Sequence, residues 1–371
     1  MNRFPLASSS WDEAERDALQ RVIASDRFTM GPEVAAFEAE FARFAGSRHA
    51  VMVNSGSSAN LAMVAALRYR QDPASRLMPG DQVIVPAVSW STSFFPLHQY
   101  GLHLKFVDID RETLNYDLAA LAAAIDDRTR AVMAVNLLGN PNDFDAIRSL
   151  IGTRRILLIE DNCESMGATF AGRQAGTFGV MGTFSTFFSH HISTMEGGLV
   201  VTDDEELYHI LLALRAHGWT RDLPRRNRVT GEKGEDPFEE SFRFVLPGYN
   251  LRPLEMSGAL GRAQLEKLPR LVAARRAMGR GDGRSPAVPH PARDRRKQLV
   301  RLCAGAAPRM QARPARGSGA ARRAGIRDPA HRQRQFHRQS RAAADGPQPA
   351  RADDPCGRDR PQRLFHRQPP P

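Results

Sequence analysis

Two polar segments directly follow apolar runs and hold groups that could bind an anion or a ring nitrogen. Ser55-Gly56-Ser57-Ser58 follows the run at residues 50–53 and precedes an apolar stretch with helical spacing. The N–H groups and dipole of a helix start favour phosphate there, although an ordinary N-cap turn is the commoner use of such residues. Asp161 follows the run at 156–160. Its carboxylate could pair with a ring nitrogen or a metal, and a helix N-cap is an equally good interpretation.

A third segment could move protons. His190 and His191 precede a Glu196-Gly197-Gly198 turn. The two imidazoles could ligate a metal, but adjacent residues of a strand point to opposite faces, which disfavours joint coordination. We therefore predict one catalytic histidine, titrating near neutral pH, beside a structural neighbour.

The hydrophobic pattern predicts the scaffold that must position these segments. Apolar runs of strand length alternate with helix-like stretches: strands at 50–53, 82–86, 105–110, 131–138, 156–160 and 199–202, helices at 11–25, 34–44, 59–67, 118–125 and 143–151. This alternation predicts an α/β fold whose mostly parallel sheet is sandwiched by helices. Ligands of such sheets bind beyond the carboxyl ends of the strands, where the polar segments lie. Ser10 is the expected N-cap of the first helix, with Glu13 as its capping-box partner.

Charge and composition divide the chain. The 371 residues carry a net charge of +11, yet residues 281–371 contain 21 basic and 7 acidic residues, which leaves −3 for residues 1–280. The tail also holds 13 of the 25 prolines and has no Glu, Tyr or Trp. Such a composition cannot offset the entropy of folding, so disorder is expected in the tail.

Several protein classes are disfavoured. No apolar run approaches the roughly 18 residues of a membrane-spanning helix, and the first ten residues are no secretory signal. Cys163, Cys303 and Cys356 are too few and too scattered for a disulfide framework or a four-thiolate metal site. We therefore expect a cytoplasmic protein with no membrane partner and no bound metal.

Eight short motifs occur in the order found in a known family: Gly31…Val34…Phe37-Glu38, Ser55-Gly56-Ser57, FVDID at 106–110, Asn140-Pro141…Asp143, Glu160-Asp161, Phe184-Ser185, Glu196-Gly197-Gly198 and GYNLR at 248–252. On these motifs the chain resembles the DegT/DnrJ/EryC1/StrS sugar aminotransferases, which are pyridoxal-phosphate (PLP) enzymes of fold type I. The resemblance covers about residues 5–275. It implies the PLP-dependent large domain over residues 1–275 and a homodimer with its active site at the subunit interface.

One position departs from the aminotransferases. They place a lysine, which holds the cofactor covalently, six residues before the Glu of Glu-Gly-Gly, and here that position is His190. This resembles the sugar 3-dehydratase branch of the family. With only Cys163 in the folded region, the iron–sulfur type of that branch is excluded. Motifs at 86–92, 162–167 and 217–220 resemble the iron-free type. That type removes the C3 hydroxyl of GDP-4-keto-6-deoxymannose, on the route to colitose in lipopolysaccharide O-antigen, and glutamate regenerates pyridoxamine phosphate.

The resemblance also implies a role for each matched residue. His190 is the catalytic base. The phosphate ligands are Gly56, Ser57 and Ser185, together with Asn250 from the neighbouring subunit. Asp161 pairs with the pyridinium nitrogen, Glu164 hydrogen-bonds the ring 3-hydroxyl, and Trp90 stacks on the ring. His217 is a weaker candidate for contact with sugar or glutamate. Structural alternatives are a core position for Trp90 and a packing role for His191.

Residues 276–371 do not continue the resemblance. Phe336-His337-Arg338-Gln339, recoded one base on, permits Phe-Thr-Gly-Asn, and the run back to Ile326 then resembles the C-terminal small domain of the family. We interpret the tail as a shifted reading frame in which the small domain is missing or scrambled. One alternative is a basic arm that binds nucleic acid, disfavoured because the tail lacks interleaved aromatic residues. Another is a sugar aminotransferase that uses a different lysine.

Overall fold

The computed structural model describes residues 9–278 and 295–296 of the chain. The chain divides into two units, residues 1–323 and residues 324–371, and every described residue belongs to the first. The predictions of disorder and of a shifted frame in the tail therefore fall almost wholly outside the described residues.

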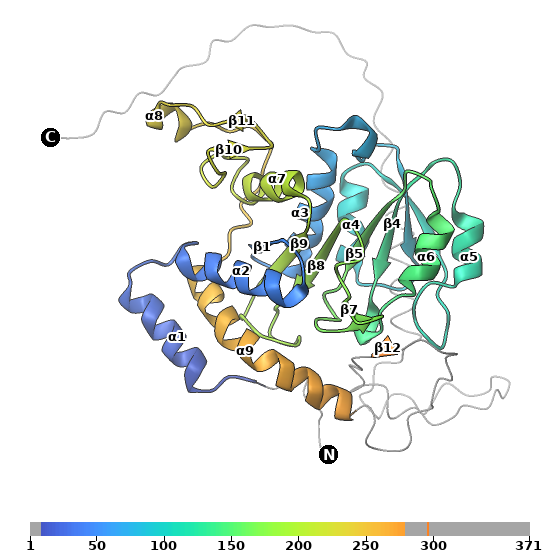
Figure 1. The fold of residues 1–371 in the computed structure, drawn as a ribbon, viewed down its shortest axis with the longest axis horizontal. Coiled ribbons are helices and arrows are strands. Elements are labelled where there is room, and N and C mark those ends of the chain that lie inside the picture. Colours follow the sequence, from blue (N-terminus) through green and yellow to red (C-terminus); the bar gives the residue numbers. More distant parts are fainter. Residues whose placement is uncertain (1–8, 279–294, 297–371) are drawn as a thin grey trace, which may run out of the picture. The chain divides into compact units, whose positions relative to one another are not determined.

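A seven-stranded sheet forms the centre of the described unit, in the order β1-β9-β8-β5-β4-β2-β3 (Figure 1). Its strands are β1 (His49–Val53), β2 (Gln82–Pro86), β3 (His103–Val107), β4 (Thr129–Val135), β5 (Leu157–Asp161), β8 (Met181–Ser185) and β9 (Gly198–Thr202). The pairs from β3 through β2, β4 and β5 to β8 are parallel, and β9 is antiparallel to both of its neighbours. The predicted mostly parallel sheet is confirmed. The pattern did not predict β8, because Gly182, Thr183 and Ser185 interrupt its apolar run.

Helices cover both faces of this sheet, as predicted. The major helices are α1 (Glu13–Ala24), α2 (Pro32–Ala45), α3 (Gly56–Arg68), α4 (Ser91–Gln99), α5 (Leu118–Ala124), α6 (Phe144–Ile151), α7 (Glu205–Arg215) and α9 (Glu255–Met278). Alternation along β1 separates the two faces: Val51 and Val53 pack with α3, α4 and α7, whereas Ala50 and Met52 pack with α2 and α9. On this second face, α5 and α6 cover the part of the sheet around β2 and β4.

Short elements complete the described chain. They are the 3₁₀ turns η1 (Pro73–Ser75) and η2 (Leu137–Gly139), the short helix α8 (Pro237–Glu240), and the strands β6 (Thr169–Phe170), β7 (Arg173–Gln174), β10 (Arg226–Asn227), β11 (Gly231–Glu232) and β12 (Arg295–Arg296). Within the described residues, none of the helices combines the length and apolar character needed to cross a membrane.

The predicted cap of the first helix is wrong by two residues. Asp12, not Ser10, is the N-cap of α1, and Glu15, not Glu13, closes the capping box. The reason is tertiary. Ser10 Oγ donates to Gln264 of α9 at 2.8 Å, and the buried Glu15 carboxylate accepts from Lys267 of the same helix at 2.6 Å. These contacts with α9 select the second of two overlapping Ser/Asp-x-x-Glu patterns.

The carboxyl ends of β1, β5 and β8 and the start of β9 lie at one edge of the sheet, because β9 alone runs the other way. The second glycine of the Glu-Gly-Gly motif has a steric cause: a Cβ atom on Gly198 would lie 2.3 Å from the Ser55 carbonyl oxygen. The motif thus lets the start of β9 approach the Ser55–Ser57 turn.

Candidate active site

The turn after β1 is a capped helix start whose free N–H groups are able to bind an anion. We call Ser55–Ser57 the anion cradle. Ser55 caps α3, its Oγ accepting from the Ser58 N–H at 3.1 Å, and the first turn contains no acidic residue. The N–H groups of Gly56 and Ser57 belong to that turn, where helix geometry provides no acceptor. A Cβ atom on Gly56 would lie 2.7 Å from Ser185 Cβ, so Ser185 of β8 adjoins the same cradle. Ser57 Oγ hydrogen-bonds Thr92 Oγ1 at 2.9 Å.

Asp161, the last residue of β5, is a buried carboxylate with an exposed fraction of 5%. Its Oδ2 accepts from Asn60 Nδ2 at 2.8 Å and from Ser93 Oγ at 2.7 Å, and its Oδ1 accepts from the Cys163 N–H at 3.0 Å. The N-cap interpretation is wrong, because turns rather than a helix follow. None of the ion pairs among the described residues includes Asp161. A buried carboxylate in this state favours a cationic ligand.

Glu164 lies one turn beyond Asp161. Its Oε2 accepts from the Leu138 N–H at 3.1 Å, and burial raises the pKa of its carboxyl group. The raised pKa favours the protonated form, which can donate a hydrogen bond to a ligand oxygen.

His190 lies in the loop between β8 and β9, closed at its base by the Thr186 N–H bond to the Gly197 carbonyl (2.9 Å) and by contact of the Thr186 and Thr194 hydroxyls (2.6 Å). Burial lowers the pKa of His190. The Asp161 carboxylate opposes this shift, and the Arg275 guanidinium, which donates to the His190 carbonyl at 3.2 Å, adds to it. The lowered pKa favours the neutral imidazole, which is able to accept a proton.

The neighbouring histidine, His191, is buried. His191 is 3% exposed, consistent with the predicted packing role. Both histidines lie in bends outside any strand, so their side chains do not follow the alternation of a strand. No group of three His, Cys, Asp or Glu side chains within the described residues could hold a metal ion.

The remaining predicted residues lie around this edge or on a separate pair of segments, those that carry His217 and Asn250, which we call the strap. Trp90 precedes α4 and is 63% exposed, so the alternative of a core aromatic is wrong. His217 and Asn250 lie on two antiparallel segments, joined by the bond from the His217 N–H to the Tyr249 carbonyl at 2.6 Å. Asn250 is exposed and accepts from Arg252 Nε at 3.0 Å. No hydrogen bond between described residues joins either of them to Asp161.

Sequence reasoning missed three buried residues behind Asp161: Asn60, Ser93 and Thr183. The sequence contains a spacing signal for two of them, Asn60 and Thr183. Asn60 follows Gly56 by four residues and so shares its helix face, and Thr183 precedes Ser185 by two residues and so shares its strand face. The link from Ser93 to Asp161 joins elements that no local pattern connects.

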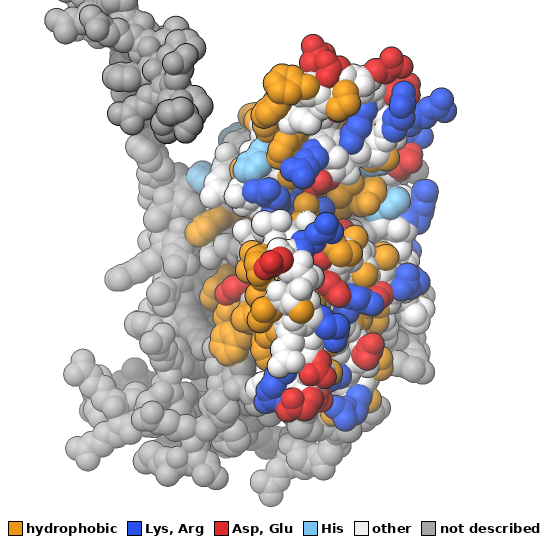
Figure 2. Space-filling model, turned by 90° about the vertical axis from the view of Figure 1, so that its left-hand side faces the viewer, with side chains coloured by type: hydrophobic (Ala, Val, Ile, Leu, Met, Phe, Trp, Pro, Cys, Tyr) orange, Lys and Arg blue, Asp and Glu red, His pale blue; other side chains and the backbone are white. Residues whose placement is uncertain are grey.

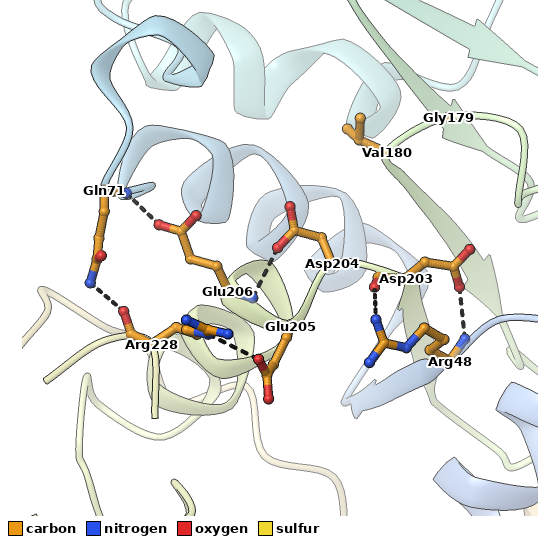
Figure 3. A pocket seen from close by; sticks show the side chains of 9 residues that line it. All are labelled: Arg48, Gln71, Gly179, Val180, Asp203, Asp204, Glu205, Glu206 and Arg228. Atoms are coloured by element: carbon orange, nitrogen blue, oxygen red, sulfur yellow. Dashed lines mark hydrogen bonds and ion pairs between the residues drawn. The ribbon is translucent and has the colours of Figure 1, made fainter. Parts of the chain in front are cut away.

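A cavity of about 680 Å³ lies away from this site, at the opposite ends of β1 and β9 (Figure 3). Its lining comprises Arg48, Gln71, Gly179, Val180, Asp203, Asp204, Glu205, Glu206 and Arg228. The charged side chains have partners: the Asp203 carboxylate accepts from the backbone N–H of Arg48 at 2.7 Å, the Arg48 guanidinium donates to the Asp203 carbonyl at 3.2 Å, and Arg228 pairs with Glu205 at 2.9 Å. The cavity therefore offers no unpaired catalytic group.

Fold and site together define the class of protein. The model of the DegT/DnrJ/EryC1/StrS aminotransferase family matches residues 9–280, and the chain belongs to this family. Over 276 residues it is 63% identical to GDP-4-keto-6-deoxy-D-mannose 3-dehydratase of Yersinia pseudotuberculosis. The matched residues cover 74% of this chain and 70% of that protein.

Solved structures agree with this assignment. The E. coli GDP-4-keto-6-deoxy-D-mannose-3-dehydratase with bound hydrated PLP superposes with a TM-score of 0.73 at 63% identity, over 74% of this chain and 70% of that one. A GDP-4-keto-6-deoxymannose-3-dehydratase with a trapped PLP-glutamate geminal diamine gives a TM-score of 0.72 at 59% identity, over 78% and 74% of the two chains.

The residues at the sheet edge fit PLP. The cradle matches a phosphate, Asp161 matches a protonated ring nitrogen, and Glu164 can serve a ring oxygen. The lysines of the described residues are engaged elsewhere: Lys105 with Asp126 (2.9 Å), Lys233 with the Arg221 carbonyl (3.0 Å), and Lys267 with Glu15. Among the described residues, the position of the family lysine therefore holds an imidazole and no amine replaces it.

The surroundings of His190 make a prediction about its titration. Its imidazole should titrate with a midpoint below the ordinary value of 6.5, measured by long-range ¹H–¹⁵N NMR. Asp161→Asn should lower the midpoint further, because it removes a stabilising negative charge, and Arg275→Gln should raise it, because it removes a repelling positive one. Equal midpoints in all three proteins would show that neither charge acts on the imidazole.

Proposed function

We propose that this protein is a PLP-dependent 3-dehydratase that removes the C3 hydroxyl of GDP-4-keto-6-deoxymannose, with glutamate as the amine donor. One observation carries the proposal: a histidine, His190, occupies the position of the family lysine, within electrostatic reach of the buried Asp161. The relatives named for this reaction support the choice of nucleotide and sugar.

The reaction divides among the residues of the site. Bound as pyridoxamine phosphate, the cofactor supplies an amine for the sugar C4 ketone and an acceptor for electrons. Gly56, Ser57 and Ser185 bind its phosphate, Asp161 keeps its ring nitrogen protonated, and Trp90 covers the ring. One ring nitrogen of His190 would take a proton from the aminomethyl carbon of the cofactor and return it to the C3 oxygen, which leaves as water. His217 contacts the sugar or glutamate.

The replacement of lysine by histidine decides the outcome. A lysine amine would compete for the cofactor and direct the reaction toward amine transfer. Imidazole accepts and returns a proton without holding the cofactor covalently. A sugar aminotransferase that uses another lysine is less well supported, because the three lysines of the described residues, Lys105, Lys233 and Lys267, are bound elsewhere.

The proposal predicts a product and a variant phenotype. Supplied with PLP, glutamate and GDP-4-keto-6-deoxymannose, the protein should release ammonia and 2-oxoglutarate together with a 3-deoxy sugar nucleotide, measured by mass spectrometry. His190→Asn should lower the rate at least about 100-fold, the typical contribution of a general base, and retain PLP binding.

His98→Asn, the same change at an exposed position, serves as the control and should keep full activity. Accumulation of a 4-amino sugar nucleotide would contradict the dehydratase proposal. Loss of PLP binding in the His190 variant would instead indicate a structural role for that residue.

We also propose a cytoplasmic homodimer acting on the route to colitose in O-antigen. Phe238, Phe242 and Phe244 have exposed fractions of 74%, 64% and 56%, more than an isolated subunit would favour. Hydrophobic side chains gather at the top of the face in Figure 2, interleaved with charges. Asn250 lies exposed on the strap and would reach the phosphate of a second copy.

The dimer predicts a mass in solution. Light scattering after size exclusion should give twice the chain mass of 41.1 kDa. The double variant Phe238→Ser, Phe242→Ser should shift the protein toward monomer, because it removes apolar area from the interface. Ile23→Ser, at an exposed apolar position on α1, should not. A monomeric wild-type protein would overturn this part of the proposal.

We propose, finally, that residues 1–275 are the PLP-dependent large domain and that residues 276–371 arise from a shifted reading frame. The loss of family motifs and the abrupt change in composition support this. The gene should show one inserted or deleted base around codons 270–300, and restoring the frame should encode the small domain of the family. An intact frame over those codons in independent isolates would contradict the proposal.

A further inference from the structure

The two oxygens of Asp161 are held differently. Oδ2 accepts two side-chain donors, Asn60 Nδ2 at 2.8 Å and Ser93 Oγ at 2.7 Å. Oδ1 accepts the backbone N–H of Cys163 at 3.0 Å, and the thiol of that residue, a weak donor, lies beside the carboxylate. A carboxylate oxygen has two acceptor positions, so Oδ2 is saturated and Oδ1 is the oxygen left for a strong donor.

The amide of Asn60 can adopt only one orientation. Thr183 Oγ1 donates to Asn60 Oδ1 at 2.6 Å, and Nδ2 donates both to the Thr92 carbonyl at 3.1 Å and to Asp161. A flipped amide would place its oxygen against that carbonyl and the carboxylate, two acceptors. Asn60 is 2% exposed, Ser93 2% and Thr183 fully buried, so water does not replace these bonds.

Helix α3 provides residues both to the anion cradle and to the hydrogen bonds of Asp161. Asn60 lies four residues after Gly56 in α3, one turn below the anion cradle. Ser93, on α4, is in turn the acceptor of Ser89 Oγ at 2.6 Å, so its own proton points to Asp161. Two helices thus fix the carboxylate from the side opposite to Oδ1.

We propose that Asn60 and Ser93 are positioning residues that lock the Asp161 carboxylate with Oδ1 presented to the ring N–H of the cofactor. This inference rests on the proposed function. Thr183 acts indirectly, because its hydrogen bond fixes the amide orientation of Asn60. The lock keeps the carboxylate in place without a cation and leaves its charge for the ligand.

The test compares binding of PLP with that of 1-deaza-PLP, in which a C–H replaces the ring nitrogen. Dissociation constants are measured by absorbance and fluorescence titration of the full chain. The wild-type protein should bind PLP at least about ten-fold more tightly than the deaza compound, the range expected for a charge-assisted hydrogen bond. Asn60→Leu should reduce this preference several-fold, and Ser93→Ala and Thr183→Val should reduce it in the same direction.

Asn142→Leu is the matched control: Asn142 is a buried asparagine, 1% exposed, whose amide bonds Asn136 and the Val135 carbonyl rather than Asp161. It should keep the wild-type preference. Ser93→Ala, the smallest change, keeps the test decisive if Asn60→Leu does not fold. An unchanged preference in folded Ser93→Ala and Thr183→Val would overturn the inference and leave the proposed function standing. A wild-type protein that binds neither compound would overturn both.

Discussion

The site depends on one buried negative charge. Asp161 ends the central strand β5, with an exposed fraction of 5%, and the described chain gives it hydrogen bonds and no cation. Desolvating a carboxylate costs several kcal/mol, so this charge is tolerated only because three donors satisfy it. The donors come from α3, α4 and the turn after β5. The sheet and two helices must therefore be assembled before the carboxylate can be held.

This charge acts on the neighbouring groups, although burial is the larger influence on the pKa of His190 and of Cys163. It attracts a protonated ring nitrogen, and it partly offsets the burial that lowers the pKa of His190. It also helps to raise the pKa of the Cys163 thiol, although burial is the larger cause, so the thiol stays neutral. A neutral imidazole and an uncharged thiol beside one carboxylate give a site with a proton acceptor and no amine nucleophile, which suits elimination better than amine transfer.

Much of the fold could be predicted because strands of a parallel sheet are buried on both faces. The runs at 50–53, 82–86 and 156–160 are continuous and apolar for that reason, and each matches an observed strand. β8 was not predicted because it contains Gly182, Thr183 and Ser185. These small or polar residues face the site or a close backbone contact, and they break the apolar run that marks a buried strand. The first N-cap was misplaced because α9, more than 250 residues away, binds Ser10 and Glu15.

The site was predictable where residues act alone and not where they act through others. Asp161 and His190 could be named because each carries its own chemistry after a strand or before a glycine turn. Asn60 and Ser93 carry no chemistry of their own. The spacing from Gly56 places Asn60 on the face of the site, but its partnership with Ser93 appears only when α3 and α4 bring both to one carboxylate oxygen. The proposed role of Asn250 involves a second subunit, and no local pattern in one chain encodes a contact between two chains.

The central claim is that the site holds its cofactor without a lysine. The most direct measurement is borohydride reduction of the protein saturated with PLP, followed by intact-mass spectrometry and peptide mapping. We predict an unmodified chain after removal of free cofactor, because His190 replaces the family lysine and the lysines of the described residues, Lys105, Lys233 and Lys267, are engaged elsewhere. A stoichiometric phosphopyridoxyl group on any lysine would contradict it.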